Sequence, residues 1–189
     1  MSDSNDPCPC EMDGIGDCIS PVGHDETVVK VVVKRDHLVV DLNGKVSLTH
    51  TAISKDDLAK KVGRNGKQRS VSTFRSCLTP SDDLGRRAKE LTKEAAWKDN
   101  PILAIAHTGS LRNITAKDTR REICVYAEPT GEDDPLGPCP SHAGIIRSFL
   151  PPDPSNLLEW LTLRTEVASC FSEILYCCSQ ANVGKEILD

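Results

Sequence analysis

A cysteine and a histidine in a rigid loop are the first residues whose types and spacing could carry out chemistry. Cys139 and His142 are three positions apart, within a stretch rich in proline and glycine at 133–144. A thiol and an imidazole at this spacing could act as nucleophile and base, or as two ligands of one metal ion. A zinc site would need further ligands, for which Cys8 and Cys10 are candidates, although zinc sites usually have more than one residue between paired cysteines. The alternative is a proline-braced turn that leads into the next strand.

A second group consists of arginine and serine residues near the ends of predicted strands. Ser72 and Arg75 belong to a hydroxyl-rich run, and Ser110 and Arg112 follow an apolar strand. Arginine forks combined with hydroxyl and backbone donors suit a carboxylate or a phosphate group. The alternative is that these arginines form ordinary surface ion pairs, and the sequence contains no glycine-rich loop of the Walker type.

Two histidines could supply proton transfer to such an anion site. His107 ends the apolar strand before Ser110, and His142 lies in the proline-rich loop. If both met the arginines in one cleft, they could act as general acid and base on a phosphate ester. This enzyme hypothesis therefore requires side chains from distant segments to converge.

The composition of the 189-residue chain indicates what kind of protein contains these residues. Hydrophobic residues make up 38% and charged residues 27%, which is sufficient for the core of one domain. Residues 1–26 show no periodic apolar pattern, so we expect a flexible tail followed by a single domain at 27–189. The net charge of −5 argues against nucleic-acid binding. No run resembles a membrane span or a signal peptide, which predicts a cytoplasmic protein.

Nine cysteines are many for such a compartment. Their odd number and irregular spacing argue against a disulfide framework. Cysteines inside apolar runs are expected to pack as small hydrophobic residues. A bound zinc ion stays open as the one cofactor that the sequence suggests.

Short apolar or β-branched runs separated by turn signals predict the strands of the domain. The expected strands cover 28–33, 37–42, 45–49, 102–107, 123–127 and 144–147. Asn43-Gly44 predicts a hairpin turn, and the first three strands are expected to form an antiparallel meander. Helices are expected at 54–62 and 81–95. These elements predict an α+β fold with an antiparallel-led mixed sheet and helices on one face.

The segment 155–182 predicts a long C-terminal helix with a wide apolar surface. Two adjacent apolar stripes exceed the arc of ~100° that is usual for a surface helix. Either the helix is buried within its own domain, or one side packs on the sheet while the other binds a partner. In the second case, the expected interaction residues are Trp160, Leu163, Val167, Phe171 and Ile174.

Four short motifs follow one another between residues 69 and 147. They read R-S-V-S-x-F-R, A-x-x-H-T-G-x-L-R, V-x-x-x-P-T and D-P-L-x-x-x-P-S-H-A. This order resembles a loose family of small bacterial proteins for which no activity is established, and the specific part is Pro-x-His-Ala. The resemblance implies a bacterial or phage setting and a common core that includes His142. Cys139 stands where the family usually has a polar residue, which weakens the case for a nucleophilic thiol.

These observations lead to two main functional hypotheses. The sequence favours an accessory protein that binds a protein partner through its C-terminal helix, with homo-oligomerisation left open. The second hypothesis is a phosphate-ester hydrolase or transferase that handles an anion or nucleotide through His107, His142, Arg75 and Arg112. A small zinc-binding protein is the remaining alternative.

Overall fold

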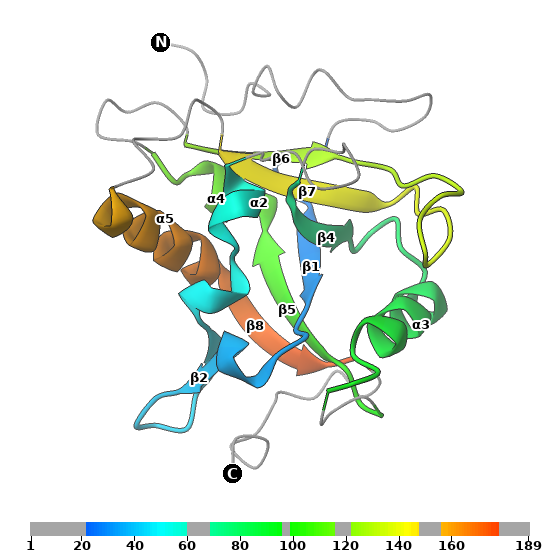
Figure 1. Ribbon diagram of the computed structural model, residues 1–189, viewed down its shortest axis with the longest axis horizontal. Helices are drawn as coiled ribbons and strands as arrows, with labels where there is room; N and C mark the ends of the chain where they lie inside the picture. Colours follow the sequence, from blue (N-terminus) through cyan, green and yellow to red (C-terminus); the bar gives the residue numbers. More distant parts are fainter. Residues whose placement is uncertain (1–21, 60–68, 96–98, 116–121, 148–155, 178–189) are drawn as a thin grey trace.

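The computed structural model of the protein describes residues 22–59, 69–95, 99–115, 122–147 and 156–177. Within these ranges, a six-stranded sheet, a two-stranded sheet and four α-helices form an α+β fold (Figure 1). The predicted fold class is therefore confirmed. Every neighbouring pair of strands in the large sheet is antiparallel.

The large sheet has the strand order β6-β7-β4-β1-β5-β8. Its strands are β1 (Thr27–Val31), β4 (Val71–Arg75), β5 (Ile102–His107), β6 (Ile123–Ala127), β7 (His142–Arg147) and β8 (Phe171–Tyr176). The small sheet consists of β2 (Leu38–Val40) and β3 (Val46–Leu48). The helices are α2 (Lys55–Leu58), α3 (Ser81–Leu91), α4 (Thr108–Arg112) and α5 (Leu157–Ser169), and two 3-10 turns cover Arg35–His37 and His50–Ala52.

Strand β1 lies in the middle of the large sheet because it buries apolar side chains on both of its faces. The consecutive residues Val28 and Val29 are 0% and 3% exposed. Val29 lies opposite Phe74 of β4 on one side and opposite Ile105 of β5 on the other. A strand buried on both faces suits the centre of a sheet rather than the start of a meander. The predicted pairing of this strand with the following one is therefore wrong.

Strands β2 and β3 form the hairpin that Asn43-Gly44 predicts. Gly44 has a φ of 80°, in the left-handed region that glycine adopts without a steric penalty. The Asp41 carboxylate accepts hydrogen bonds from the backbone N–H groups of Asn43 and Lys45, at 2.8 and 2.9 Å. The hairpin forms its own small sheet and contributes three buried side chains to the main core: Leu38, Val46 and Leu48.

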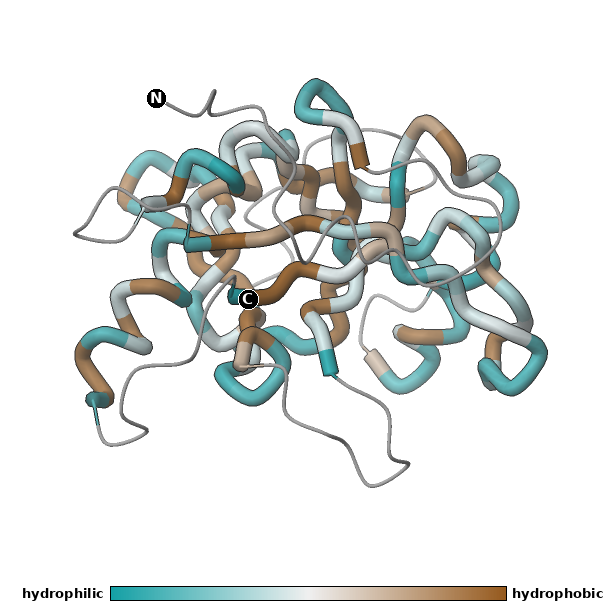
Figure 2. Tube along the Cα trace, turned by 90° about the horizontal axis from the view of Figure 1, so that it is seen from above, coloured by the Kyte–Doolittle hydropathy of each residue, from teal (hydrophilic) through white to brown (hydrophobic). Residues whose placement is uncertain are grey.

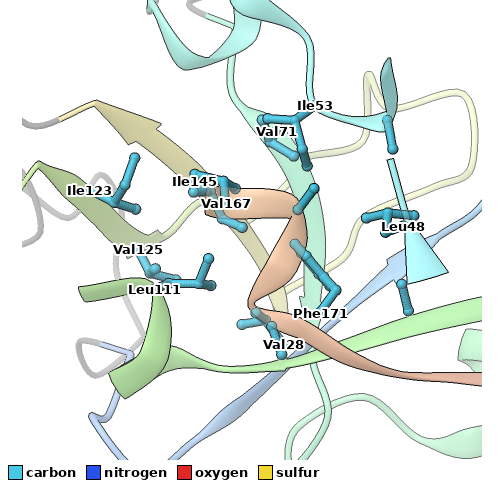
Figure 3. Packing of buried hydrophobic residues seen from close by; sticks show 14 of the residues in the cluster. Val28, Leu48, Ile53, Val71, Leu111, Ile123, Val125, Ile145, Val167 and Phe171 are labelled. Atoms are coloured by element: carbon cyan, nitrogen blue, oxygen red, sulfur yellow. The ribbon is translucent and has the colours of Figure 1, made fainter. Parts of the chain in front are cut away.

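The main core lies on one side of the large sheet, called here the core face. Figure 3 shows Val28, Val71 and Ile145 of the sheet near Leu111 of α4 and Val167 of α5. Each of these side chains is at most 1% exposed. Burying one such side chain stabilises a fold by about 1.5–3 kcal/mol, so this cluster holds the helices on the sheet. Seen from above, hydrophobic segments, in brown, run through the middle of the molecule (Figure 2).

The opposite side of the sheet, called here the α3 face, buries a smaller cluster. Val29 and Phe74 of the sheet contact Ala88 of α3 and Cys139 of the loop between β6 and β7. Three of the four described helices thus contribute to the core face, and α3 covers the other, so the prediction of helices on one face is wrong for α3. The cover of this face is incomplete at β4, where Ser72 is exposed.

The prediction of one helix over 155–182 is wrong in its second half. Helix α5 ends at Ser169, and Phe171–Tyr176 form β8, which pairs with β5. The last part of the predicted helix, 178–182, lies outside the described residues.

A bulge in β8 explains why this strand resembled a helix. Ala106 pairs with Phe171, but the adjacent Ile105 pairs with Glu173, so β8 has one additional residue at this point. The additional residue leaves two successive side chains exposed and separates the buried Phe171 and Ile174 by three positions. That separation is typical of a helix face, whereas a regular strand buries every second residue.

The cysteines only partly behave as the sequence suggests. Cys170 and Cys177 are half-buried, as expected for packing residues. Cys124 is 0% exposed in β6, but it is also disulfide-bonded, so the expectation that it only packs as a small hydrophobic residue is wrong. Sequence spacing cannot reveal such a bond, because it depends on which segments the fold brings together.

Two further predictions concern the ends of the chain and membranes. The expected tail falls almost entirely outside the described residues, and Cys8 and Cys10 lie there. Within the described ranges, no helix combines the length and the hydropathy that a bilayer-spanning segment needs.

Candidate functional site

Strands β4 and β7 bring Ser72 and His142 together. Ser72 lies opposite Gly144 and Phe74 lies opposite His142, so the serine and the histidine are diagonal neighbours on the α3 face. Ser72 Oγ is 2.6 Å from His142 Nε2. The rings of Phe74 and His142 are T-shaped, with centroids 5.7 Å apart. The imidazole is therefore positioned by both its own strand and the neighbouring one.

The hydrogen bonds of His142 define the tautomer of its neutral ring. Nδ1 lies 2.8 Å from the backbone oxygen of Glu128, which can only accept a hydrogen bond. Nδ1 therefore carries the proton, and Nε2 has a free lone pair. Ser72 must then donate its hydroxyl hydrogen to Nε2. A serine that donates to a histidine lone pair is the starting arrangement of base-activated nucleophilic catalysis.

The Glu128 side chain completes a polar network behind the histidine ring. Its Oε2 lies 3.6 Å from His142 Nδ1, close enough to stabilise a positive charge on the imidazole. Tyr126 donates a 2.9 Å hydrogen bond to Oε1, and Ser70 donates to Oε2. Burial and the Glu128 charge raise the pKa of Tyr126, so its hydroxyl keeps its proton and remains a donor. The carboxylate is thus held from two sides.

Gly144 leaves room for this network in the middle of three strands. It pairs with Ser72 of β4 and with Tyr126 of β6. A Cβ atom at this position would lie 2.8 Å from side-chain atoms of both Ser70 and Glu128. Such a contact is too close, so a larger residue at position 144 would separate Ser70 from the Glu128 carboxylate.

A pocket of about 430 Å³ lies over Ser72 and His142. The sheet forms its floor, α3 and the residues that follow it form one wall, and the loop residues 134–139 form the other. In Figure 1, the loop between β6 and β7 runs beside α3. The volume lies within the range of small-molecule sites, about 300–1,000 Å³.

Arg87 joins the two walls of this pocket. Its Nε donates to Asp83 at 2.9 Å, while Nη1 and Nη2 donate to the backbone oxygens of Gly137 and Pro138 at 3.2 and 2.5 Å. Arg87 is 2% exposed, and its hydrogen bond lowers the pKa of the Asp83 carboxyl. This guanidinium is committed to the fold, and it fixes the loop against α3.

Arg75, predicted to bind an anion, does not face the pocket. Its Nε and Nη2 donate to the Glu26 carboxylate at 2.8 and 2.5 Å, and it is 2% exposed. Arg75 lies opposite Val28, whose side chain belongs to the core face, whereas His142 is on the α3 face. The two residues are therefore separated by the sheet.

Arg112 and His107 also lie away from the pocket. Arg112 is buried and donates from Nη2 to the backbone oxygens of Val22 and Val125, at 2.7 and 3.1 Å. His107 is exposed at the end of β5, three strand positions from β7, which corresponds to roughly 14 Å. Ser110 is exposed on α4, beyond His107. The convergent cleft required by the phosphate-ester hypothesis is therefore not formed.

The residues suggested for zinc do not form a metal site within the described ranges. Both ring nitrogens of His142 are used by Ser72 and by the Glu128 backbone. Cys139 is 1% exposed, and its Sγ lies 3.5 Å from Ser141 Oγ. Among the described residues, no group of three or more His, Cys, Asp or Glu side chains is arranged to hold a metal ion. Cys8 and Cys10 lie outside the described residues.

The five residues predicted to bind a partner are inside the domain. All are at most 5% exposed and belong to the main core: Trp160, Leu163, Val167, Phe171 and Ile174. The alternative of a helix buried within its own domain describes this side of α5. The exposed leucines of α5 are instead Leu157, Leu158 and Leu161, at 72%, 73% and 43%.

The sequence predicts site roles for Ser72 and His142, but it gives no role to Glu128. Glu128 follows β6 directly, and β6 pairs with the strand that begins at His142. An acid just after a predicted strand is a usable signal once the strand order is known. The sequence alone does not supply that order.

No family model, curated protein or solved structure matches this chain. The resemblance to small bacterial proteins stays a prediction.

Proposed function

We propose that the protein is a serine-dependent hydrolase of small esters. In this proposal, Ser72 is the nucleophile, His142 is the general base, and Glu128 orients the imidazole and stabilises its charge. The observation that carries the proposal is the 2.6 Å contact between Ser72 Oγ and His142 Nε2. The 2.8 Å contact of Nδ1 with the backbone oxygen of Glu128 assigns the ring proton to Nδ1.

The reaction has two stages. Ser72 Oγ attacks the ester carbonyl carbon while its proton passes to His142 Nε2. The bond to the alcohol oxygen then breaks, and the alcohol leaves with that proton, which gives an acyl-serine. In the second stage, a water molecule from solvent loses a proton to Nε2 and attacks the acyl carbon. The acid is released, and the proton returns to Ser72 Oγ.

The same hydrogen bonds would also be present if Ser72 and His142 only joined β4 to β7 and had no catalytic role. Two features favour chemistry instead. Ser72 is exposed, so an external substrate can contact its hydroxyl group. The hydroxyl and the imidazole also both line a pocket of ligand size. A solely structural role requires neither an exposed Ser72 nor a pocket beside it.

Reaction with a fluorophosphonate probe tests the proposal directly. The probe transfers a phosphonyl group to activated serines, so the wild-type protein should be labelled and Ser72→Ala should not. Ser110→Ala is the matched control, because Ser110 is also an exposed serine but lies on α4. Loss of labelling in Ser72→Ala alone supports the proposal. Equal labelling of both variants, or no labelling of the wild type, contradicts it.

Protein binding through α5 is the second candidate function. Three exposed leucines near the start of the helix favour it: Leu157, Leu158 and Leu161. A second copy of the chain is the simplest occupant to test, since apolar patches of this kind often mark interfaces. Sedimentation velocity should then show association that Leu158→Glu removes. A single monomeric species at every wild-type concentration would contradict self-association.

A further inference from the structure

The pocket beside Ser72 presents mainly apolar groups to a bound molecule. Phe74 lies in the floor, Leu91 is on the α3 wall, and Pro135 and Leu136 are on the loop wall. Cys139, which is free and buried, adds a weakly polar surface to the same space. These side chains suit a hydrocarbon group rather than a charged one.

The charged groups around the pocket are bound to partners within the chain. The Arg87 guanidinium is bound to Asp83 and to loop carbonyl groups. Lys93 Nζ lies 2.8 Å from Glu90 Oε1 at the exposed rim. Asp134 Oδ1 accepts the backbone N–H of Leu136 at 2.8 Å. An ionised acyl group would therefore lose its hydration in this pocket, while the Arg87 and Lys93 cations are already bound to partners.

The loop wall is fixed in place rather than free to move away. Besides the Arg87 contacts, Cys139 exchanges two backbone hydrogen bonds with Thr130, each of 3.1 Å. Gly137 has a φ of 78°, which produces the sharp turn that follows Leu136. Because this wall is fixed, the volume of about 430 Å³ limits the size of the group that the pocket can hold.

We propose that the acyl group of the substrate is short, uncharged and apolar, and that it occupies this pocket. The inference rests on the proposed ester hydrolysis by Ser72. Each methylene group that enters the pocket should raise kcat/KM about three- to fourfold, as expected from the burial of hydrocarbon. The increase should stop when the chain reaches the end of the pocket, and longer chains should react more slowly.

A series of p-nitrophenyl esters tests the inference on the full-length chain. The acyl groups are acetate, butyrate, hexanoate, octanoate and dodecanoate, and the charged hemisuccinate is compared with butyrate. We expect an optimum inside the series and at least about a tenfold lower kcat/KM for hemisuccinate than for butyrate. Leu136→Asn should flatten the chain-length profile. Leu78→Asn is the matched control, because Leu78 is 48% exposed and does not line the pocket.

The outcomes separate this inference from the proposed function. If acetate hydrolysis depends on Ser72 but the profile is flat, or if hemisuccinate equals butyrate, the acyl pocket is wrong and the hydrolase stands. A best substrate of dodecanoate also contradicts a pocket of limited depth. If no ester is hydrolysed in a Ser72-dependent manner, both the hydrolase and the acyl pocket are overturned.

Discussion

Replacing His142 with asparagine should lower kcat/KM for p-nitrophenyl butyrate by at least about 100-fold, the lower limit usual for loss of a general base. Asparagine can still hydrogen-bond to Ser72, but it cannot take up the serine proton. The Nδ1 proton that points at Glu128, and the Nε2 lone pair that faces Ser72, both belong to the imidazole. The measurement is the initial rate of p-nitrophenol release, together with a melting curve to verify that the variant is folded.

His107→Asn is the control for this substitution. His107 is exposed at the end of β5 and lies outside the pocket, so the variant should keep the wild-type rate. Equal rates in the wild type and in folded His142→Asn would mean that this imidazole is not the base. A large loss in His107→Asn would point back to the histidine pair that the sequence suggested.

Replacing Glu26 with alanine should reduce the free energy of unfolding by about 3 kcal/mol, the lower end for breaking a buried ion pair. Arg75 is 2% exposed and would lose the carboxylate that faces its Nε and Nη2. The lower end applies because the Glu26 side chain is 20% exposed. Chemical denaturation measures the change. Asp25→Ala is the matched control, because it removes an exposed acid one position away and should have little effect.

The contribution of Glu26 to stability should depend on pH. Burial opposes ionisation of its carboxyl, but the hydrogen bonds from Arg75 and Gly23 and the Arg75 charge together lower its pKa below the ordinary 4.5. A carboxyl with a lowered pKa in the folded state stabilises the protein above its ordinary pKa and ceases to do so as the pH falls through the lowered value. The stability difference between wild type and Glu26→Gln should therefore be largest near neutral pH and shrink below pH 4.5. A difference that stays constant down to acidic pH would contradict the ion pair.

Local patterns in the sequence predicted the elements whose structure depends on nearby residues. The β2–β3 hairpin follows from its turn residues, and β5 and β6 follow from their apolar runs. Pairing partners were predicted less well, because they depend on the whole chain. β1 pairs with β4 and β5 rather than with its neighbour in sequence, since both of its faces are buried. The β8 bulge imitated helical spacing, which no local rule distinguishes from a helix.

The sequence predicted residues that belong to the candidate site, but it did not predict which of them meet. The sequence predicts site roles for both Ser72 and His142, but in different groups, because 70 positions separate the two residues. Their contact depends on the pairing of β4 with β7, and the role of Glu128 depends on the pairing of β7 with β6. Arg75 and Arg112 are charged residues near strand ends, which predicts anion binding, but each binds a partner within the chain instead.

Detection of an acyl group on Ser72 is the most direct test of the central claim. The wild-type protein is mixed with p-nitrophenyl butyrate, quenched in acid before turnover is complete, digested and analysed by peptide mass spectrometry. The mechanism predicts a butyryl group on the peptide that contains Ser72, and its absence from that peptide in His142→Asn. Ester hydrolysis with no acyl group on Ser72, or with the butyryl group on the exposed thiol of Cys77, would contradict it.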